Sequence, residues 1–270
     1  MKSLYVNTKD QTFLTTDGTH LIIADPNTKI RSLLISELDT VLVRGRVIID
    51  SQAVFFLARH NVAISLMEKD GHQDALFLPY NHCLAFHYRE QRIILKSAEN
   101  MMRYIKWLNT QKMLQQMAVI RRFSPQIKLK NEIGEGDYQC WLKEMRPLSL
   151  QLWMVVKNQI EILLRNFLAN KILKAGLDIH LGGYFRRANY GFLLDMMFIM
   201  EVRADEDSLL FFKQKNWKEL VEEESSNNFI LLEEGFHNIV HRFENKKAKL
   251  SDIVDLIIDD FFALLRELRS

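Results

Sequence analysis

Cysteine and proline are scarce in this chain, which has two cysteines and four prolines among its 270 residues. Cys83 and Cys140 lie too far apart for a paired cysteine motif of the kind that binds zinc. One possible pair also cannot form a disulfide framework, so we expect the reducing environment of the cytoplasm.

Long apolar runs and a strong net charge are also absent. No stretch approaches the roughly 20 apolar residues that cross a bilayer, and no basic-then-apolar secretion signal opens the sequence, so we expect a soluble protein without a membrane partner. The net charge is only +2, so a nucleic-acid partner has to be inferred from local clusters of charge. The lack of a glycine-rich phosphate loop and of a nucleophile elbow argues against the enzyme classes that depend on them.

The first 80 residues are typical of a small β domain. Short β-branched and apolar runs recur between turn residues, as in THLIIA, TVLVRGRVII and VAISLM. Asp50 is suited to cap a short helix that ends at Arg59. Helical periodicity replaces the strands after Pro79. We predict an α+β fold with a small N-terminal β-sandwich-like domain over residues 1–82 and a larger all-α domain over residues 83–270.

The second part of the chain is predicted to consist of long helices. Residues 83–122 contain no glycine or proline and predict one or two of them. Another apolar helix is expected over residues 149–175. Two amphipathic helices complete the chain, one over residues 229–243 and one over residues 253–268, with Ser251 as the N-cap of the latter.

Basic side chains recur at helical spacing soon after the predicted boundary, which would place them on one side of a helix. Such a stripe can neutralise DNA phosphates. The alternative is an ordinary solvated helix face, and Glu90 and Glu99 weaken the positive field. The stripe consists of Arg89, Arg92, Lys96, Arg103 and Lys106, and Arg121 with Arg122 and Arg186 with Arg187 form further basic pairs.

Several carboxylates and one histidine in the middle of the chain are candidate ligands for a hard metal ion, although acidic residues near loops are also commonly just solvated. They are Glu135, His180, Asp195, Glu201, Asp205 and Asp207. His237 and His241 also stand four residues apart on one helix. The string HNIVH lacks the glutamate of a zinc-protease helix, which favours ordinary helix packing there.

Over nearly its full length the chain resembles the Cas-one family of CRISPR-associated proteins, the integrases that insert new spacers into a CRISPR array. The segment LLISELDTVLVRGRVIIDSQAVFFLARHNVAISLMEKDG is similar to that family's strand, glycine turn at Gly45, short helix, strand and hairpin. GLDIHLGGYF and EVRADED resemble the motif pair that brings a histidine and an aspartate onto one divalent ion. The family's helical domain begins with a basic segment, which REQR followed by KWLNTQ resembles. The residues at positions that match the family's are Arg89, Arg92, Lys106, Asn109 and Gln111.

The same resemblance implies a three-ligand metal site that this chain alters at two positions. Glu135 corresponds to the family's glutamate, but Phe185 stands in place of the histidine. An alignment without gaps puts Met197 in place of the metal-binding aspartate. A phenyl ring and a thioether are poor ligands for magnesium or manganese. A shift of two residues would instead make Asp195 a ligand, with His180 reaching in from the preceding loop.

Three interpretations therefore stay open. The first is a catalytically impaired protein of CRISPR adaptation that binds DNA, forms a homodimer, has Cas-two as an implied partner and holds no cofactor tightly. The second is an active metal-dependent endonuclease or integrase in which Glu135, His180 and Asp195 hold magnesium or manganese. The third is a protein-interaction module that docks a partner through the apolar C-terminal helices. The predicted DNA-binding residues are Arg89, Arg92, Lys96, Arg103, Lys106, Arg186, Arg187 and Arg203.

Overall fold

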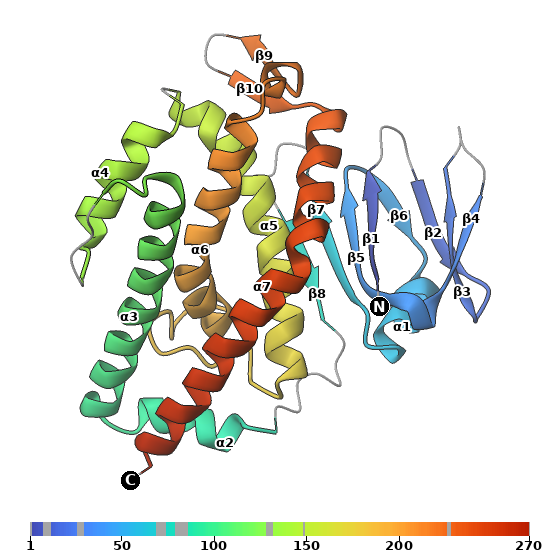
Figure 1. Cartoon of the computed structure of the whole chain (residues 1–270). Coiled ribbons are helices and arrows are strands. Elements are labelled where there is room, and N and C mark those ends of the chain that lie inside the picture. The colour runs from blue at the N-terminus through green and yellow to red at the C-terminus, as the bar shows by residue number, and fades with distance from the viewer. Residues whose placement is uncertain are drawn as a thin grey trace. The chain divides into compact units, whose positions relative to one another are not determined.

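A computed structural model describes residues 2–7, 12–25, 30–68, 74–78, 86–127, 132–147, 149–225 and 228–269 of the chain. The chain divides into two compact units, Met1–Leu84 and Ala85–Ser270 (Figure 1). The predicted boundary near residue 82 lies outside the described residues. Within the described ranges, no helix is long and apolar enough to cross a membrane.

The N-terminal unit contains two four-stranded sheets and one helix, α1 (Ser51–Arg59). One sheet has the order β1-β5-β7-β8, and the other has the order β4-β3-β2-β6. Parallel pairs join β1 to β5, β5 to β7 and β2 to β6, whereas the remaining neighbours are antiparallel. The strands are β1 (Lys2–Asn7), β2 (Thr12–Thr16), β3 (His20–Ala24), β4 (Arg31–Leu34), β5 (Leu38–Arg44), β6 (Val47–Ile49), β7 (Ala63–Met67) and β8 (Asp74–Phe77), with a 3-10 turn, η1 (Ile35–Glu37), before β5.

One apolar core holds this unit together. Leu14, Leu21, Val41 and Leu57 come from both sheets and from α1, and all four are buried in the same cluster. The period-two alternation of the sequence places these side chains on the inner faces of the strands. The Asp50 side chain accepts a hydrogen bond from the Gln52 backbone amide at 3.1 Å and so caps α1. The predicted β domain and its short helix are confirmed.

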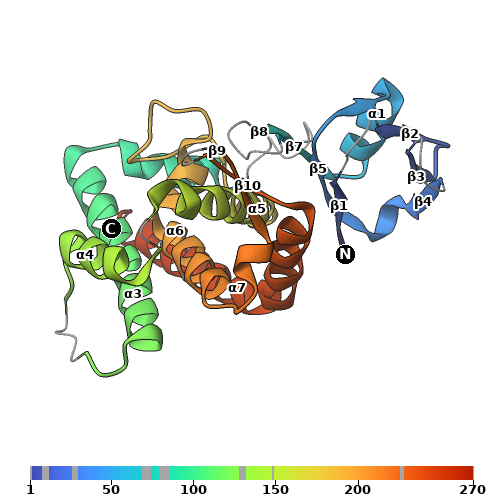
Figure 2. The same cartoon turned by 90° about the horizontal axis from the view of Figure 1, so that it is seen from above.

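The C-terminal unit is mainly helical, which confirms the α+β class. The α6 helix packs against both α3 and α5, and α5 also packs against α7. Figures 1 and 2 show α3 and α4 side by side at one end of this unit. The elements are α2 (Tyr88–Gln91), η3 (Arg92–Leu95), α3 (Ala98–Phe123), α4 (Glu135–Met145), α5 (Leu150–Lys174), α6 (Gly191–Phe212), η4 (Trp217–Glu219), β9 (Val221–Ser225), β10 (Asn228–Leu231) and α7 (Glu233–Glu267).

The basic stripe does not lie on one continuous helix, so that part of the prediction is wrong. A new helix begins after Ser97, whose hydroxyl accepts a hydrogen bond from the Asn100 amide at 3.0 Å. The Asn100 side chain also donates to the carbonyl oxygen of Ile93 at 2.8 Å. This capping separates α2 and η3, which carry the first part of the stripe, from α3.

The C-terminal helices were also predicted wrongly, because α7 runs without interruption from Glu233 to Glu267. Ser251 lies inside this helix and donates a hydrogen bond to Asp255 at 3.2 Å instead of capping a helix start. No glycine or proline follows Gly235, so nothing in the sequence forces a break. Phe229 belongs to the β9–β10 hairpin, which the sequence reasoning missed.

Candidate metal centre and nucleic-acid interface

A groove of about 580 Å³ lies along α3 in the helical unit. Glu135 reaches it from the first turn of α4, a position where the helix dipole favours a negative charge. The Asp137 side chain fixes the start of that helix by accepting a hydrogen bond from the Gly134 amide at 3.3 Å. The groove is lined by Met102, Ile105, Lys106, Asn109, Thr110, Lys112, Met113, Gln116, Glu132, Ile133 and Glu135.

The side chain of Lys112 lines this groove, and its ammonium group is paired with two carboxylates. Its Nζ is 3.2 Å from Glu135 Oε2 and 2.5 Å from Glu201 Oε1. The Lys112 side chain is only 7% exposed, and its Nζ also stands 4.1 Å from the centre of the Phe198 ring. A charged group this deeply buried is stable only when it is paired, and the two carboxylates provide that pairing.

Glu135 is held by further hydrogen bonds. Gln116 donates to its Oε2 at 2.7 Å, and Gln139 donates to its Oε1 at 2.8 Å. Burial alone would raise the pKa of Glu135, but the hydrogen bonds from Gln139 and Gln116 and the charge of Lys112 outweigh it and lower the pKa. The group is therefore an ionised carboxylate whose two oxygens already have donors.

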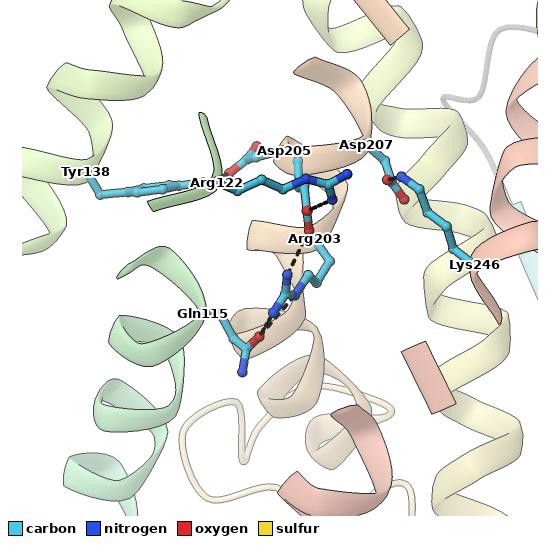
Figure 3. Close-up of polar contacts among 8 residues, drawn as sticks. Gln115, Arg122, Tyr138, Arg203, Asp205, Asp207 and Lys246 are labelled. Carbon is cyan, nitrogen blue, oxygen red and sulfur yellow. Dashed lines mark hydrogen bonds and ion pairs between the residues drawn. The ribbon is translucent and has the colours of Figure 1, made fainter. Parts of the chain in front are cut away.

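Asp205 and Asp207, two other candidate ligands, are paired with basic residues of other helices. Asp205 accepts a hydrogen bond from the Tyr138 hydroxyl at 3.1 Å and forms an ion pair with Lys157 at 2.7 Å. Asp207 forms an ion pair with Lys246 of α7 (Figure 3). These contacts tie α6 to its neighbouring helices.

Glu206 and Arg203 form a second part of the same network. Arg203 donates to Glu206 Oε2 at 2.7 Å and through its Nε to Gln115 at 3.0 Å, and Arg122 forms a further ion pair with Glu206 (Figure 3). The Arg203 side chain is 12% exposed. Of the eight predicted DNA-binding residues, Arg203 is the one that is not exposed.

Asp195 is fully buried and organises the loop before α6. Its carboxylate accepts hydrogen bonds from the backbone amides of Gly183 at 2.7 Å, Tyr184 at 3.3 Å and Phe185 at 2.9 Å. The Tyr104 hydroxyl donates to it at 2.8 Å. Burial raises the pKa of Asp195, and these hydrogen bonds only partly oppose that shift. The side chain acts as a backbone anchor.

A sequence model of the CRISPR associated protein Cas1 matches residues 4–143, slightly more than half of the chain. The chain belongs to the Cas1 family. The match includes the β unit, α3 and Glu135 at the start of α4, and it ends before the segments of Phe185 and Met197. No curated protein sequence matches the chain significantly.

Solved Cas1 structures have the same fold at low sequence identity. A Cas1 protein from Thermotoga maritima is 13% identical with a TM-score of 0.79, over 100% of this chain and 97% of that one. A casposase bound to its integration product is 17% identical with a TM-score of 0.69, over 91% and 82% of the two chains. A complex of TtCas1 with DNA is 12% identical with a TM-score of 0.62, over 98% and 92%.

The residues of this Cas1 family member do not fit the divalent ion that the family resemblance implies. Phe185 and Met197 offer no oxygen or nitrogen donor from their side chains. Met197 is 8% exposed and belongs to the apolar core. Across the described part of the chain, no group of three or more histidine, cysteine, aspartate or glutamate side chains is placed to hold a metal ion.

The shifted site of Glu135, His180 and Asp195 is not assembled either. Asp195 contacts Tyr104 of α3, whereas Glu135 contacts Lys112, about 12 Å further along the same helix. His180 is exposed, and its ring stacks on Tyr190 with the ring centres 4.8 Å apart. His237 and His241 of α7 are exposed as well, so they are surface residues and not core residues.

The other seven predicted DNA-binding residues are exposed, and they lie on three segments of the helical unit. Arg103 forms an ion pair with Glu267 at 3.3 Å. The sequence reasoning missed Lys112, because nothing in the local pattern separates a buried lysine of α3 from an exposed one. The exposed residues are Arg89, Arg92 and Lys96 before α3, Arg103 and Lys106 on α3, and Arg186 and Arg187 in the loop before α6.

Proposed function

We propose that the protein is a DNA-binding member of the Cas1 family that takes part in CRISPR adaptation without catalysing metal-dependent strand transfer itself. The observation that carries the proposal is the Lys112 ammonium between Glu135 and Glu201. It supplies positive charge to the same glutamate that the family resemblance assigns to the metal ion. Phe185 and Met197 then replace the other two expected ligands.

A lysine does not reproduce the chemistry of a divalent ion. In metal-dependent phosphoryl transfer the ion activates the attacking hydroxyl by direct coordination and neutralises charge on the transferred group. The Lys112 ammonium offers no open coordination position, and its donors face Glu135 and Glu201. Binding and scaffolding are the functions that the remaining residues support.

DNA binding is supported by the exposed basic residues of the helical unit, because phosphate contacts from lysine and arginine supply most of the affinity for DNA. The solved TtCas1–DNA complex and the casposase bound to its integration product have the same fold. DNA is the proposed ligand of this chain, and the cytoplasm is its proposed location.

The protein partners proposed are a second copy of the chain, through the β unit, and Cas2. A solved Cas6-RT-Cas1–Cas2 complex contains the same fold with a TM-score of 0.67 and 13% identity, over 90% of this chain and 32% of that one. Both partnerships are family properties extended to this protein. Size-exclusion chromatography with light scattering, alone and with Cas2, measures them.

The other two interpretations have less support. An active site that used Asp195 would have to withdraw its carboxylate from the Tyr104 hydroxyl and three backbone amides. A docking surface on α7 would need several exposed apolar side chains, but Phe236, Val254 and Phe261 are fully buried. Among the large apolar residues of this helix, only Leu256 is strongly exposed.

The test combines a binding assay with a strand-transfer assay on duplex and branched DNA. Fluorescence anisotropy should show an affinity that falls steeply with sodium chloride and that needs no divalent ion, so binding persists in EDTA. Lys106→Gln should reduce the salt slope by about one. Strand-transfer products that form with magnesium or manganese and disappear with EDTA would overturn the proposal, as would a lack of DNA binding.

A further inference from the structure

A second pocket of the helical unit lies where the C-terminal end of α7 meets α2 (Figure 1). Its volume is about 500 Å³, within the range of about 300–1,000 Å³ that is typical of small-molecule sites. It shares no lining residue with the groove beside α3. We refer to it as the α2–α7 pocket, and the side chains that matter below are His87, Glu90, Asp259, Phe262, Arg266 and Arg269.

One wall of the α2–α7 pocket is held by internal pairing. Arg269 forms an ion pair with Glu90 at 2.7 Å, and His87 Nδ1 lies 2.5 Å from the other oxygen of Glu90. The hydrogen bond from Arg269, together with that from His87, lowers the pKa of Glu90. These contacts fix the end of α7 against α2, so the pocket is largely formed before any ligand binds.

Two other charged side chains of the pocket have no such role. Asp259 and Arg266 are exposed, and neither side chain forms a hydrogen bond or an ion pair with any described residue. The adjacent Asp260 differs, because it accepts hydrogen bonds from the Trp107 indole at 2.9 Å and from Gln111 at 2.5 Å. Asp260 therefore ties α7 to α3, whereas Asp259 and Arg266 are available to a ligand.

An apolar surface separates these two charges. Asp259 and Arg266 are seven residues apart, which places them on one side of α7 and about 10 Å apart along its axis. Phe262 lies between them, and its ring meets the His87 ring edge to face with centres 4.8 Å apart. The pocket therefore presents a carboxylate, an aromatic surface and a guanidinium in that order.

This order matches the chemistry of a guanine nucleotide. A carboxylate has two acceptor oxygens, and guanine presents two parallel donors, N1–H and the 2-amino group, on one edge. Adenine, cytosine and uracil offer a single donor on that edge. The guanidinium of arginine pairs with phosphate through two parallel hydrogen bonds. In an extended guanosine 5′-phosphate, the donor edge of the base and the phosphate lie at opposite ends of the molecule.

We propose that the α2–α7 pocket binds free guanosine 5′-phosphate. Asp259 accepts hydrogen bonds from the base edge, the base packs on Phe262, and Arg266 pairs with the phosphate. The inference goes beyond the proposed function and does not depend on DNA binding, because the pocket is separate from the groove beside α3.

Isothermal titration calorimetry of the full chain with four ligands tests the recognition of each part of the nucleotide. Guanosine 5′-phosphate should bind. Inosine 5′-phosphate lacks the 2-amino group, and we expect it to bind about 10-fold more weakly, because one hydrogen bond to the carboxylate is lost. Adenosine 5′-phosphate should bind no better than inosine 5′-phosphate. Guanosine without phosphate should also lose about 10-fold or more, because Arg266 then has no partner.

Two substitutions assign the ends of the nucleotide to their side chains. Asp259→Asn should weaken guanosine 5′-phosphate and strengthen xanthosine 5′-phosphate, whose 2-carbonyl accepts a hydrogen bond from the asparagine amide. Arg266→Gln should weaken guanosine 5′-phosphate but leave guanosine unchanged. The matched controls are Asp252→Asn and Lys249→Gln, which change exposed charges of α7 outside the pocket. Circular dichroism checks that each variant is folded.

The outcomes separate this site from the proposed function. Equal affinities for the guanine, hypoxanthine and adenine nucleotides, or no binding of guanosine 5′-phosphate, overturn the inference. An equal loss in Asp252→Asn and Asp259→Asn also overturns it, because a long-range field would explain that result. An oligonucleotide with a 5′-phosphorylated terminal guanosine that binds more tightly than the free nucleotide overturns the assignment to a small molecule. A chain that binds guanosine 5′-phosphate but no DNA refutes the proposed function alone.

Discussion

Replacing Lys112 with methionine removes the ammonium group that Glu135 and Glu201 share and keeps a side chain of similar length. Two carboxylates would then face each other without a cation between them. We expect this variant to be less stable than the wild type, because like charges repel and a paired charge becomes unpaired.

The size of the effect follows from the exposure of the three groups. Two unit charges 4 Å apart interact by about 4 kcal/mol at an effective dielectric constant of 20. Glu135 and Glu201 are 50% and 35% exposed, so solvent screens part of this energy. We expect a loss of about 2 kcal/mol, which corresponds to a decrease in Tm of about 4–8 °C at this chain length.

Thermal unfolding of Lys112→Met and of matched variants measures this loss. Lys106→Met is the matched control, since Lys106 is exposed on the same helix and lines the same groove. It should unfold at nearly the wild-type temperature. In a double-mutant cycle with Glu201→Gln, Lys112→Met should show a coupling energy of about 1 kcal/mol or more.

Added manganese tests whether the Lys112 side chain stabilises the protein through its charge or through its packing. Lys112→Ala leaves space between the carboxylates, and at 10 mM manganese chloride a dissociation constant of ~1 mM would return about 1.4 kcal/mol of stability. The wild type should gain no such stability. An equal increase in Tm in the wild type, or a Lys112→Met variant as stable as the wild type, would refute the reasoning.

Three further substitutions test other contacts. Burial alone would raise the pKa of Glu206, but hydrogen bonds and charge from Arg203 and Arg122 outweigh it and lower the pKa. The ionised carboxylate therefore stabilises the folded state at pH values above the unfolded pKa of 4.5. This stabilisation is lost as the pH falls through the lower pKa of the folded state. Urea unfolding of Glu206→Gln should therefore show a deficit of about 2 kcal/mol at pH 7 that closes in acid; a deficit independent of pH would contradict the pairing. Asp50→Ala should cost the N-terminal unit about 1 kcal/mol through the lost α1 cap, and an unchanged denaturation midpoint would argue against that cap. Gly176→Ala should cost the helical unit about 1 kcal/mol because φ there is +70°, which calorimetry can measure against a solvent-exposed alanine substitution.

Local sequence signals predicted the elements that have strong boundaries. The alternation of the N-terminal strands and the Asp50 cap were sufficient for the β unit. The apolar pattern predicted the extent of α5, and the structure shows that Ser149 caps this helix by accepting a hydrogen bond from the Leu152 amide at 3.2 Å. The break at Ser97 and the continuity at Ser251 were not predicted. Both serines have the capping chemistry, and only the tertiary packing around them determines which one ends a helix.

Part of the candidate site was predicted from the family resemblance alone. The resemblance assigns Phe185 and Met197 to two ligand positions, where their side chains cannot bind a hard ion, and this assignment stays a prediction. The role of Lys112 could not be predicted, since its partner Glu201 is 89 positions away in the sequence and the pair exists only after α3 packs on α6. For the same reason, Asp195 looked like an available ligand until its four donors were located.

The anchoring of the loop before α6 has a consequence for how this family member can change. The loop is fixed through backbone amides and through glycine contacts at its ends, and those features do not depend on which side chain stands at 184 or 185. The side chain at position 185 could therefore change from a histidine imidazole to a phenylalanine phenyl ring while the backbone of the segment keeps its conformation. The scaffold tolerates a change of chemistry at this position because shape and side-chain identity are controlled by different residues.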